Sequence, residues 1–201
     1  MKKVILAFIT GLIIITMQER AYSQTDLVET VINMSAGYSA VSNPSSVTTG
    51  KTNGAVCSPV INGTLDFPVS NKFTLGISIA YQSFNGTFST TYYTNFGVPY
   101  TGTYTDNTNV TNFGFRVLEH FGSEKLNGYG GLRIGYSSWS ETSSGNAAYG
   151  VNNLGAPTIM AILGLRANIT SLLAIHIELG LGSPYVFETG ISFCFGGKHW
   201  S

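Results

Sequence analysis

His176 and Glu178 are the residues of this chain whose types and spacing come nearest to catalytic chemistry. In an extended strand, side chains two positions apart face the same way, so an imidazole and a carboxylate would lie together. A hydrolase acting on lipid would combine such a pair with a serine nucleophile. Ser78 and Ser192 are candidates for that serine, but the sequence does not place either beside His176. A lipid-modifying hydrolase is one hypothesis, and a buried polar pair without catalysis is the other.

A larger set of charged residues shares the same strand phase. It consists of the arginines Arg116, Arg133 and Arg166, with Glu29, Asp66, Glu178, Glu188 and His176 opposing them. Charges taken out of water need partners, so inside a narrow barrel this set predicts an ion network that plugs the lumen. A narrow ion path is the alternative. Cys57 and Cys194 are expected to be free thiols, and without a CxxC or Cys/His cluster we expect no metal and no cofactor.

The elements that must position these residues are β-strands. In Phe73–Gln82 apolar residues alternate with small or polar ones, and Leu173–Gly182 repeats the pattern. Six further segments fit the same template: Val28–Val41, Pro59–Ser70, Asn109–Phe121, Asn127–Ser138, Ala156–Asn168 and Tyr185–Phe195. Each is close to the ~9–11 residues that a tilted strand needs to cross a bilayer. The sequence therefore predicts an all-β fold, an eight-stranded antiparallel transmembrane up-and-down β-barrel.

The connections between these strands differ in length. Short turns are expected at Ser70–Lys72, Gly122–Leu126, Ile169–Leu172 and Gly182–Pro184, and long loops at Ser42–Ser58, Ser83–Thr108 and Trp139–Gly155. Long extracellular loops and short periplasmic turns are typical of membrane barrels. Aromatic residues on the lipid phase predict two girdles, with Tyr38, Tyr81, Tyr136 and Tyr185 at the outer rim and Phe67, Phe73, Phe121 and Phe195 at the inner rim.

The composition and the first residues indicate export to the cell envelope. Charged residues make up 10% of the chain, against roughly 25% in soluble domains. The basic pair Lys2-Lys3, the apolar run Val4–Thr16 and the small-x-small pattern Ala21-Tyr22-Ser23 predict a signal peptide over 1–23 and a barrel domain over 24–201. Removing three basic residues and one acidic residue from ten of each leaves a formal charge of −2, which excludes a nucleic-acid footprint.

The last predicted strand carries the most specific motif. Thr189-Gly190-Ile191-Ser192-Phe193-Cys194-Phe195 resembles the polar–Gly–x–x–aromatic–x–aromatic signal of last strands, and the mature chain as a whole resembles the small OmpA/OmpX-like outer-membrane barrel proteins of bacteria. The resemblance implies a place in the outer membrane, contact with the lipid bilayer and lipopolysaccharide, and recognition of Thr189, Gly190, Phe193 and Phe195 by the barrel assembly machinery. Gly196–Ser201 follow the motif, whereas the family's last strand usually ends the protein.

Ser83–Thr108 is the most distinctive connection. Threonine and asparagine alternate there with aromatic residues that include Phe88, Tyr92, Tyr93, Tyr100 and Tyr104, and the one charge is Asp106. Such surfaces bind partners without strong electrostatics, and strands extending upward would expose an edge for strand addition. We expect a non-enzymatic barrel with a structural or surface-binding role, in which the extracellular loops recognise a surface protein or glycan. A flexible cover over the barrel mouth is the alternative.

A soluble secreted barrel of the lipocalin type is a further alternative. It would turn the apolar phase inward around an apolar ligand and leave the three arginines outside. The opposite phase is rich in glycine and alanine and would make a poor soluble exterior.

Overall fold

The computed structural model describes residues 29–39, 52–93, 96–145 and 152–195. The strands are β1 (Thr30–Tyr38), β2 (Thr52–Cys57), β3 (Val60–Pro68), β4 (Phe73–Tyr93), β5 (Pro99–Gly122), β6 (Leu126–Gly145), β7 (Asn152–Asn168), β8 (Leu173–Gly182) and β9 (Phe187–Phe195). None of the described segments forms a helix long and apolar enough to cross a membrane. The predicted signal peptide and the tail after Phe195 lie outside the described residues.

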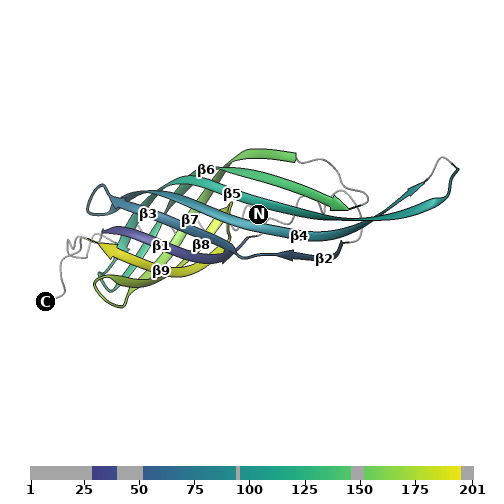
Figure 1. Cartoon of the computed structure of the whole chain (residues 1–201). Coiled ribbons are helices and arrows are strands. Elements are labelled where there is room, and N and C mark those ends of the chain that lie inside the picture. Colours follow the sequence, from purple (N-terminus) through teal and green to yellow (C-terminus); the bar gives the residue numbers. More distant parts are fainter. Residues whose placement is uncertain (1–28, 40–51, 94–95, 146–151, 196–201) are drawn as a thin grey trace, which may run out of the picture.

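Eight of these strands close into one antiparallel barrel (Figure 1). Each strand from β3 to β8 pairs with the next along the chain, and β1 closes the sheet between β3 and β9. β2 is not a ninth wall strand, because it pairs with the part of β4 that runs beyond β3. The predicted eight-stranded barrel is confirmed, and β2 continues the line of β3 outward.

The burial of side chains alternates along the wall as the sequence predicts. On β8, Ile175, Ile177 and Leu179 are about half exposed, at 51%, 48% and 52%, whereas His176 and Glu178 are buried. A contiguous apolar exterior of this extent is not found on soluble monomers, and lipid is the solvent that suits it. The barrel is therefore of the membrane-spanning kind. The lipocalin-like alternative fails because the apolar phase faces out.

Three of the expected short turns, Ser70–Lys72, Gly122–Leu126 and Ile169–Leu172, lie at one end of the barrel, and Gly182–Pro184 lies at the other. Backbone hydrogen bonds link each of the three turns to a neighbouring strand, from His120 N to Lys72 O, from Asn168 N to Lys125 O and from Cys194 N to Leu172 O. In one of these turns Gly122 has a φ of 105°, and an added Cβ would lie 2.6 Å from the Leu126 carbonyl oxygen. Both thiols, Cys57 and Cys194, are free.

The expected outer girdle is correct at three positions and wrong at the fourth. Tyr38, Tyr81 and Tyr136 are outward and exposed, but Tyr185 is fully buried. β9 begins only at Phe187, and Val186 N donates to Tyr38 O before the strand starts. The alternation assumed from residue 185 onward therefore does not apply, and the Tyr185 side chain turns into the lumen.

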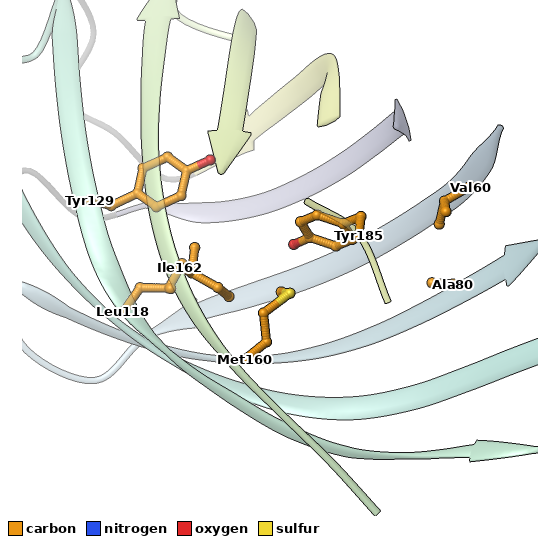
Figure 2. Close-up of a cluster of buried hydrophobic side chains, with 7 residues drawn as sticks. All are labelled: Val60, Ala80, Leu118, Tyr129, Met160, Ile162 and Tyr185. Atoms are coloured by element: carbon orange, nitrogen blue, oxygen red, sulfur yellow. The ribbon is translucent and has the colours of Figure 1, made fainter. Parts of the chain in front are cut away.

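The lumen is filled by side chains. A buried apolar cluster lies along it, from Leu118 and Tyr129 near the turns to Val60 and Ala80 nearer the outer mouth, and also contains Met160, Ile162 and Tyr185 (Figure 2). At the outer mouth, a cavity of about 20 Å³ beside Gln82 and Asn112 has room for roughly one water molecule. The predicted charged residues Asp66, Arg116 and Glu178 are thus buried among the described side chains of the lumen.

Candidate functional site

Arg116 is the centre of the charged residues in the lumen. Its Nε lies 3.0 Å from Asp66 Oδ1, and its Nη2 lies 3.3 Å from Glu178 Oε2. These residues come from β5, β3 and β8, so one guanidinium joins both sides of the barrel. All three side chains are almost completely buried, which places both ion pairs where water cannot screen them.

A glycine makes the Arg116–Asp66 contact possible. Gly76 of β4 stands between the two residues in the same row, since Asp66 pairs with Gly76 and Gly76 pairs with Arg116. An added Cβ at this position would collide with the Asp66 carboxylate. The missing side chain lets the two charges meet across an intervening strand.

Glu178 also accepts hydrogen bonds from two tyrosines. The Tyr129 hydroxyl donates to Oε2 over 3.1 Å, and the Tyr185 hydroxyl donates to Oε1. Sequence reasoning missed both residues. Tyr129 carried a usable signal, because it precedes Arg133 by four positions on the same inward phase. Tyr185 carried none, since its direction depends on where β9 begins.

Arg133 is buried beside Arg116 but does not share its ion pairs. Its Nε donates to Ser78 Oγ over 2.7 Å, while Nη1 and Nη2 have no hydrogen-bond partner among the described residues. Gly114 gives it space, since an added Cβ there would lie 2.7 Å from Arg133 Cζ. The expectation that an acidic residue would pair with each of the three arginines is therefore wrong for Arg133, whose partner is Ser78.

The remaining members of the predicted set are spread along the lumen. Glu188 faces Glu178 across β8 and β9, and Asn62 Nδ2 donates to both of its carboxylate oxygens over 3.1 Å. Arg166 is buried nearer the inner end, close enough to Cys194 to interact with it, and the half-buried Glu29 reaches the same thiol. The structure thus assembles Asp66, Arg116, Glu178 and Glu188 closely, and leaves Arg166 and Glu29 lower down.

His176 has a serine partner, as a hydrolase would need. Its Nδ1 lies 2.8 Å from Ser192 Oγ. However, Ser192 is fully buried and His176 is 3% exposed, both on the lumen side of the wall. Glu178 is engaged by Arg116 and the tyrosines rather than by the histidine. A lipid substrate outside the barrel does not reach this pair.

The close approach of Arg133 to Gly114 leads to a testable prediction about stability. Replacing Gly114 with alanine should lower the free energy of unfolding by about 1–3 kcal/mol, because the new methyl group overlaps the guanidinium. Gly63 is the matched control, since its nearest neighbour to an added Cβ is 3.8 Å away. Urea unfolding of the refolded barrel in detergent measures both variants. Equal midpoints for Gly114→Ala and Gly63→Ala would show that Arg133 is not held against Gly114.

The segment expected as the loop Ser83–Thr108 is instead a continuous β-hairpin, and this is a correction. β4 and β5 stay in register from Phe73↔Glu119 to Tyr93↔Pro99, and they run on beyond the rest of the barrel (Figure 1). The segment's alternating threonine and tyrosine residues favour strand structure, and the pairing has no break before Tyr93↔Pro99. The other long loops are also partly strand, as β2 and the upper ends of β6 and β7 show.

The outer part of this hairpin has free edges. β2 pairs with β4 only as far as Phe88, and β6 pairs with β5 only as far as Tyr104. We call Ser89–Thr103 the ribbon. In its described part it has no other strand alongside, and its tip exposes Phe96 (93%), Val98 (58%) and Tyr100 (48%).

The predicted recognition aromatics differ in their settings. Tyr100 is exposed on the ribbon, but Tyr104 is 5% exposed and faces the inner side, so its place in a surface loop is a further correction. Phe88, Tyr92 and Tyr93 lie on β4, with side chains outside the described residues. The motif Thr189–Phe195 forms most of β9 and pairs with both β8 and β1, which places Gly190 on the seam where the barrel closes. Phe193 and Phe195 face outward.

Comparisons with known proteins find structural similarity only. No protein-family model and no curated protein matches the chain. A structure of Ail, the attachment invasion locus protein of Yersinia pestis, in complex with the heparin analogue sucrose octasulfate covers 82% of this chain and 95% of its own, with 11% identity and a TM-score of 0.43. A second structure of Ail covers 82% and 91%, with 10% identity and a TM-score of 0.40. TM-scores this low carry no argument about the fold. The barrel is therefore assigned from the strand pairing of this chain.

Proposed function

We propose that this chain is a non-enzymatic outer-membrane protein that binds a surface partner through its ribbon. The observation that carries the proposal is the ribbon itself, a hairpin that leaves the barrel and pairs with no third strand among the residues that the structure describes. Unpaired N–H and C=O groups at such edges are templates for another strand. The partner is then a protein segment that adds in extended conformation, or a glycan that contacts the exposed threonines.

The apolar outward surface and the predicted export signal support a location in the outer membrane. Leucine and isoleucine side chains cover the barrel where a bilayer would lie, and tyrosines stand at its outer rim. The predicted signal peptide over 1–23 and the last-strand motif Thr189–Phe195 support export and insertion by the barrel assembly machinery. Lipid and lipopolysaccharide are then the surroundings of the wall.

The lumen is proposed to be closed rather than conducting. Arg116 joins β3, β5 and β8 through Asp66 and Glu178, and tyrosine side chains fill the space around it. An eight-stranded barrel has little interior beyond its own side chains. The charged residues therefore act as a plug that holds the wall together.

Shortening the ribbon tests the binding role. Because Phe88 and Tyr104 are paired, Ser89–Thr103 can be replaced by an Asn-Gly turn of the kind that joins paired strands. The shortened barrel should insert and show the same heat-modifiable migration, because loop length has little effect on closure of the wall. It should lose attachment to cells, matrix or a partner protein in a pull-down from the surface.

A pair of lysine variants tests the same point. Thr103→Lys places a charge on the ribbon, where a lysine discourages strand addition, and Asn71→Lys, the control, places the same charge in an exposed turn at the opposite end. Only Thr103→Lys should weaken attachment. Normal attachment by both the shortened chain and Thr103→Lys would reject the ribbon as the binding element.

A further inference from the structure

Four oxygen-bearing side chains gather on the inner face of the extracellular sheet. Asp106 and Thr108 lie on β5, and Ser143 and Glu141 are their respective partners on β6. Directly paired residues and residues two apart share a face, so the four occupy the corners of one patch about 5 Å by 7 Å. Asp106 is 4% exposed and Thr108 is 2% exposed, while Glu141 and Ser143 are half-buried.

Three side-chain oxygen atoms of this patch have no partner in the part of the chain that the structure describes. Asp106 Oδ1, Thr108 Oγ1 and Ser143 Oγ are buried without a hydrogen-bond partner among the described residues. A buried acceptor left unpaired is costly, and three on neighbouring positions of one face are unusual. The unpaired Thr108 hydroxyl is an observation independent of the two carboxylates. A bound cation would give all three oxygen atoms a partner.

The two carboxylates also lack a neutralising partner. The described residues between Tyr81 and Thr111 and between Tyr136 and Gly145 contain no lysine or arginine. Two carboxylates, Asp106 and Glu141, thus lie on one patch, and these described segments contain no lysine or arginine to neutralise them.

We propose that Asp106, Thr108, Glu141 and Ser143 form a calcium site on the inner face of the extracellular sheet. Carboxylate and hydroxyl oxygens are ligands for a hard cation, and the absence of sulfur and imidazole from this patch disfavours zinc and copper. Ca²⁺ accepts an irregular shell of oxygens completed by water, which suits ligands carried by two adjacent strands. The ion would tie β5 to β6 where the sheet leaves the barrel.

This site does not depend on whether the ribbon binds a partner. Its residues lie below the ribbon and face the other side from the exposed threonines Thr101 and Thr103 and the half-buried Thr105. The proposed function can therefore fail while the calcium site stands, and the reverse also holds.

Calcium titration of the full-length barrel tests the proposal. After treatment with a chelator, the refolded protein in detergent is titrated with CaCl₂ by isothermal calorimetry. We expect a dissociation constant of about 10⁻⁴–10⁻³ M, as in extracellular calcium modules, and at least roughly tenfold weaker binding of MgCl₂. Asp106→Asn and Glu141→Gln should each weaken calcium binding by roughly tenfold or more, since each removes one of the two charged ligands. Glu124→Gln, in an exposed turn at the opposite end, is the matched control and should bind like the wild type.

Hydrogen exchange supplies a second readout that does not depend on heat of binding. Calcium should slow amide exchange in Tyr104–Val110 and Trp139–Gly145 of the wild type and of Glu124→Gln, but not of Asp106→Asn. Several outcomes would overturn the site: no calcium binding at millimolar concentration, equal binding by Asp106→Asn and the wild type, or preference for MgCl₂.

Discussion

Replacing Glu178 with alanine should lower the free energy of unfolding of the barrel by about 3–5 kcal/mol, the range for breaking a buried ion pair. The variant leaves the Arg116 guanidinium with Asp66 alone and removes the acceptor of the Tyr129 and Tyr185 hydroxyls. The loss comes from charge and hydroxyl groups left unpaired in a dry lumen, rather than from lost attraction alone. Urea unfolding in detergent micelles, followed by the shift between folded and unfolded bands on a gel, measures it.

Two comparison variants make this result specific. Glu124→Ala removes an exposed carboxylate from a turn and should change stability by less than about 0.5 kcal/mol. Combining Glu178→Ala with Arg116→Met removes both charges, so the double variant should lose clearly less than the sum of the two single changes, by about 0.5–3 kcal/mol. Equal effects of Glu178→Ala and Glu124→Ala would mean that the lumen is hydrated and that the plug proposal is wrong.

Ile177→Lys should destabilise the barrel in a bilayer by about 2–4 kcal/mol, as cations on the lipid face near the midplane do. Ile177 lies in the middle of β8, faces outward and is 48% exposed. Refolding into phospholipid vesicles over a range of urea concentrations measures the change. In an aqueous surrounding the same lysine would be well solvated and would cost little.

The controls place the same charge elsewhere. Thr103→Lys lies on the ribbon, away from the wall, and should leave insertion and stability unchanged. Ile177→Ala separates the loss of side-chain volume from the effect of charge, and should cost less than lysine. If Ile177→Lys and Thr103→Lys behave alike in vesicles, the outward face of β8 does not contact lipid, and the membrane-spanning assignment fails.

The sequence by itself determined the strands, the faces and the end of the barrel at which the turns lie. A period of two in segments such as Phe73–Gln82 is a local property, because successive side chains of a strand alternate whatever the strand pairs with. The inward placement of Arg116, Arg133 and Arg166 follows from that same alternation, and the structure agrees. The eight-strand count needed only the number of such segments.

The loops expected from the sequence are longer than those in the structure. The polar composition of Ser83–Thr108 suggests a loop, although threonine and tyrosine are good strand formers. Backbone pairing continues to Tyr93↔Pro99 because each strand supplies the other with hydrogen bonds, with no need for an apolar face. Hydrophobic alternation marks where a barrel crosses lipid, and it does not mark where its strands end.

Only the tertiary structure decided which charges meet. Asp66, Arg116 and Glu178 lie far apart in the sequence, and their contacts depend on the register of every intervening strand around the closed wall. Gly76 allows one contact by lacking a side chain, and the late start of β9 turns Tyr185 inward to Glu178. Arg133, on the same phase as Arg116, meets Ser78 instead of a carboxylate. Each strand sets locally which of its side chains face inward. Which of these side chains meet is set by strand register and barrel closure, and these depend on all the strands together.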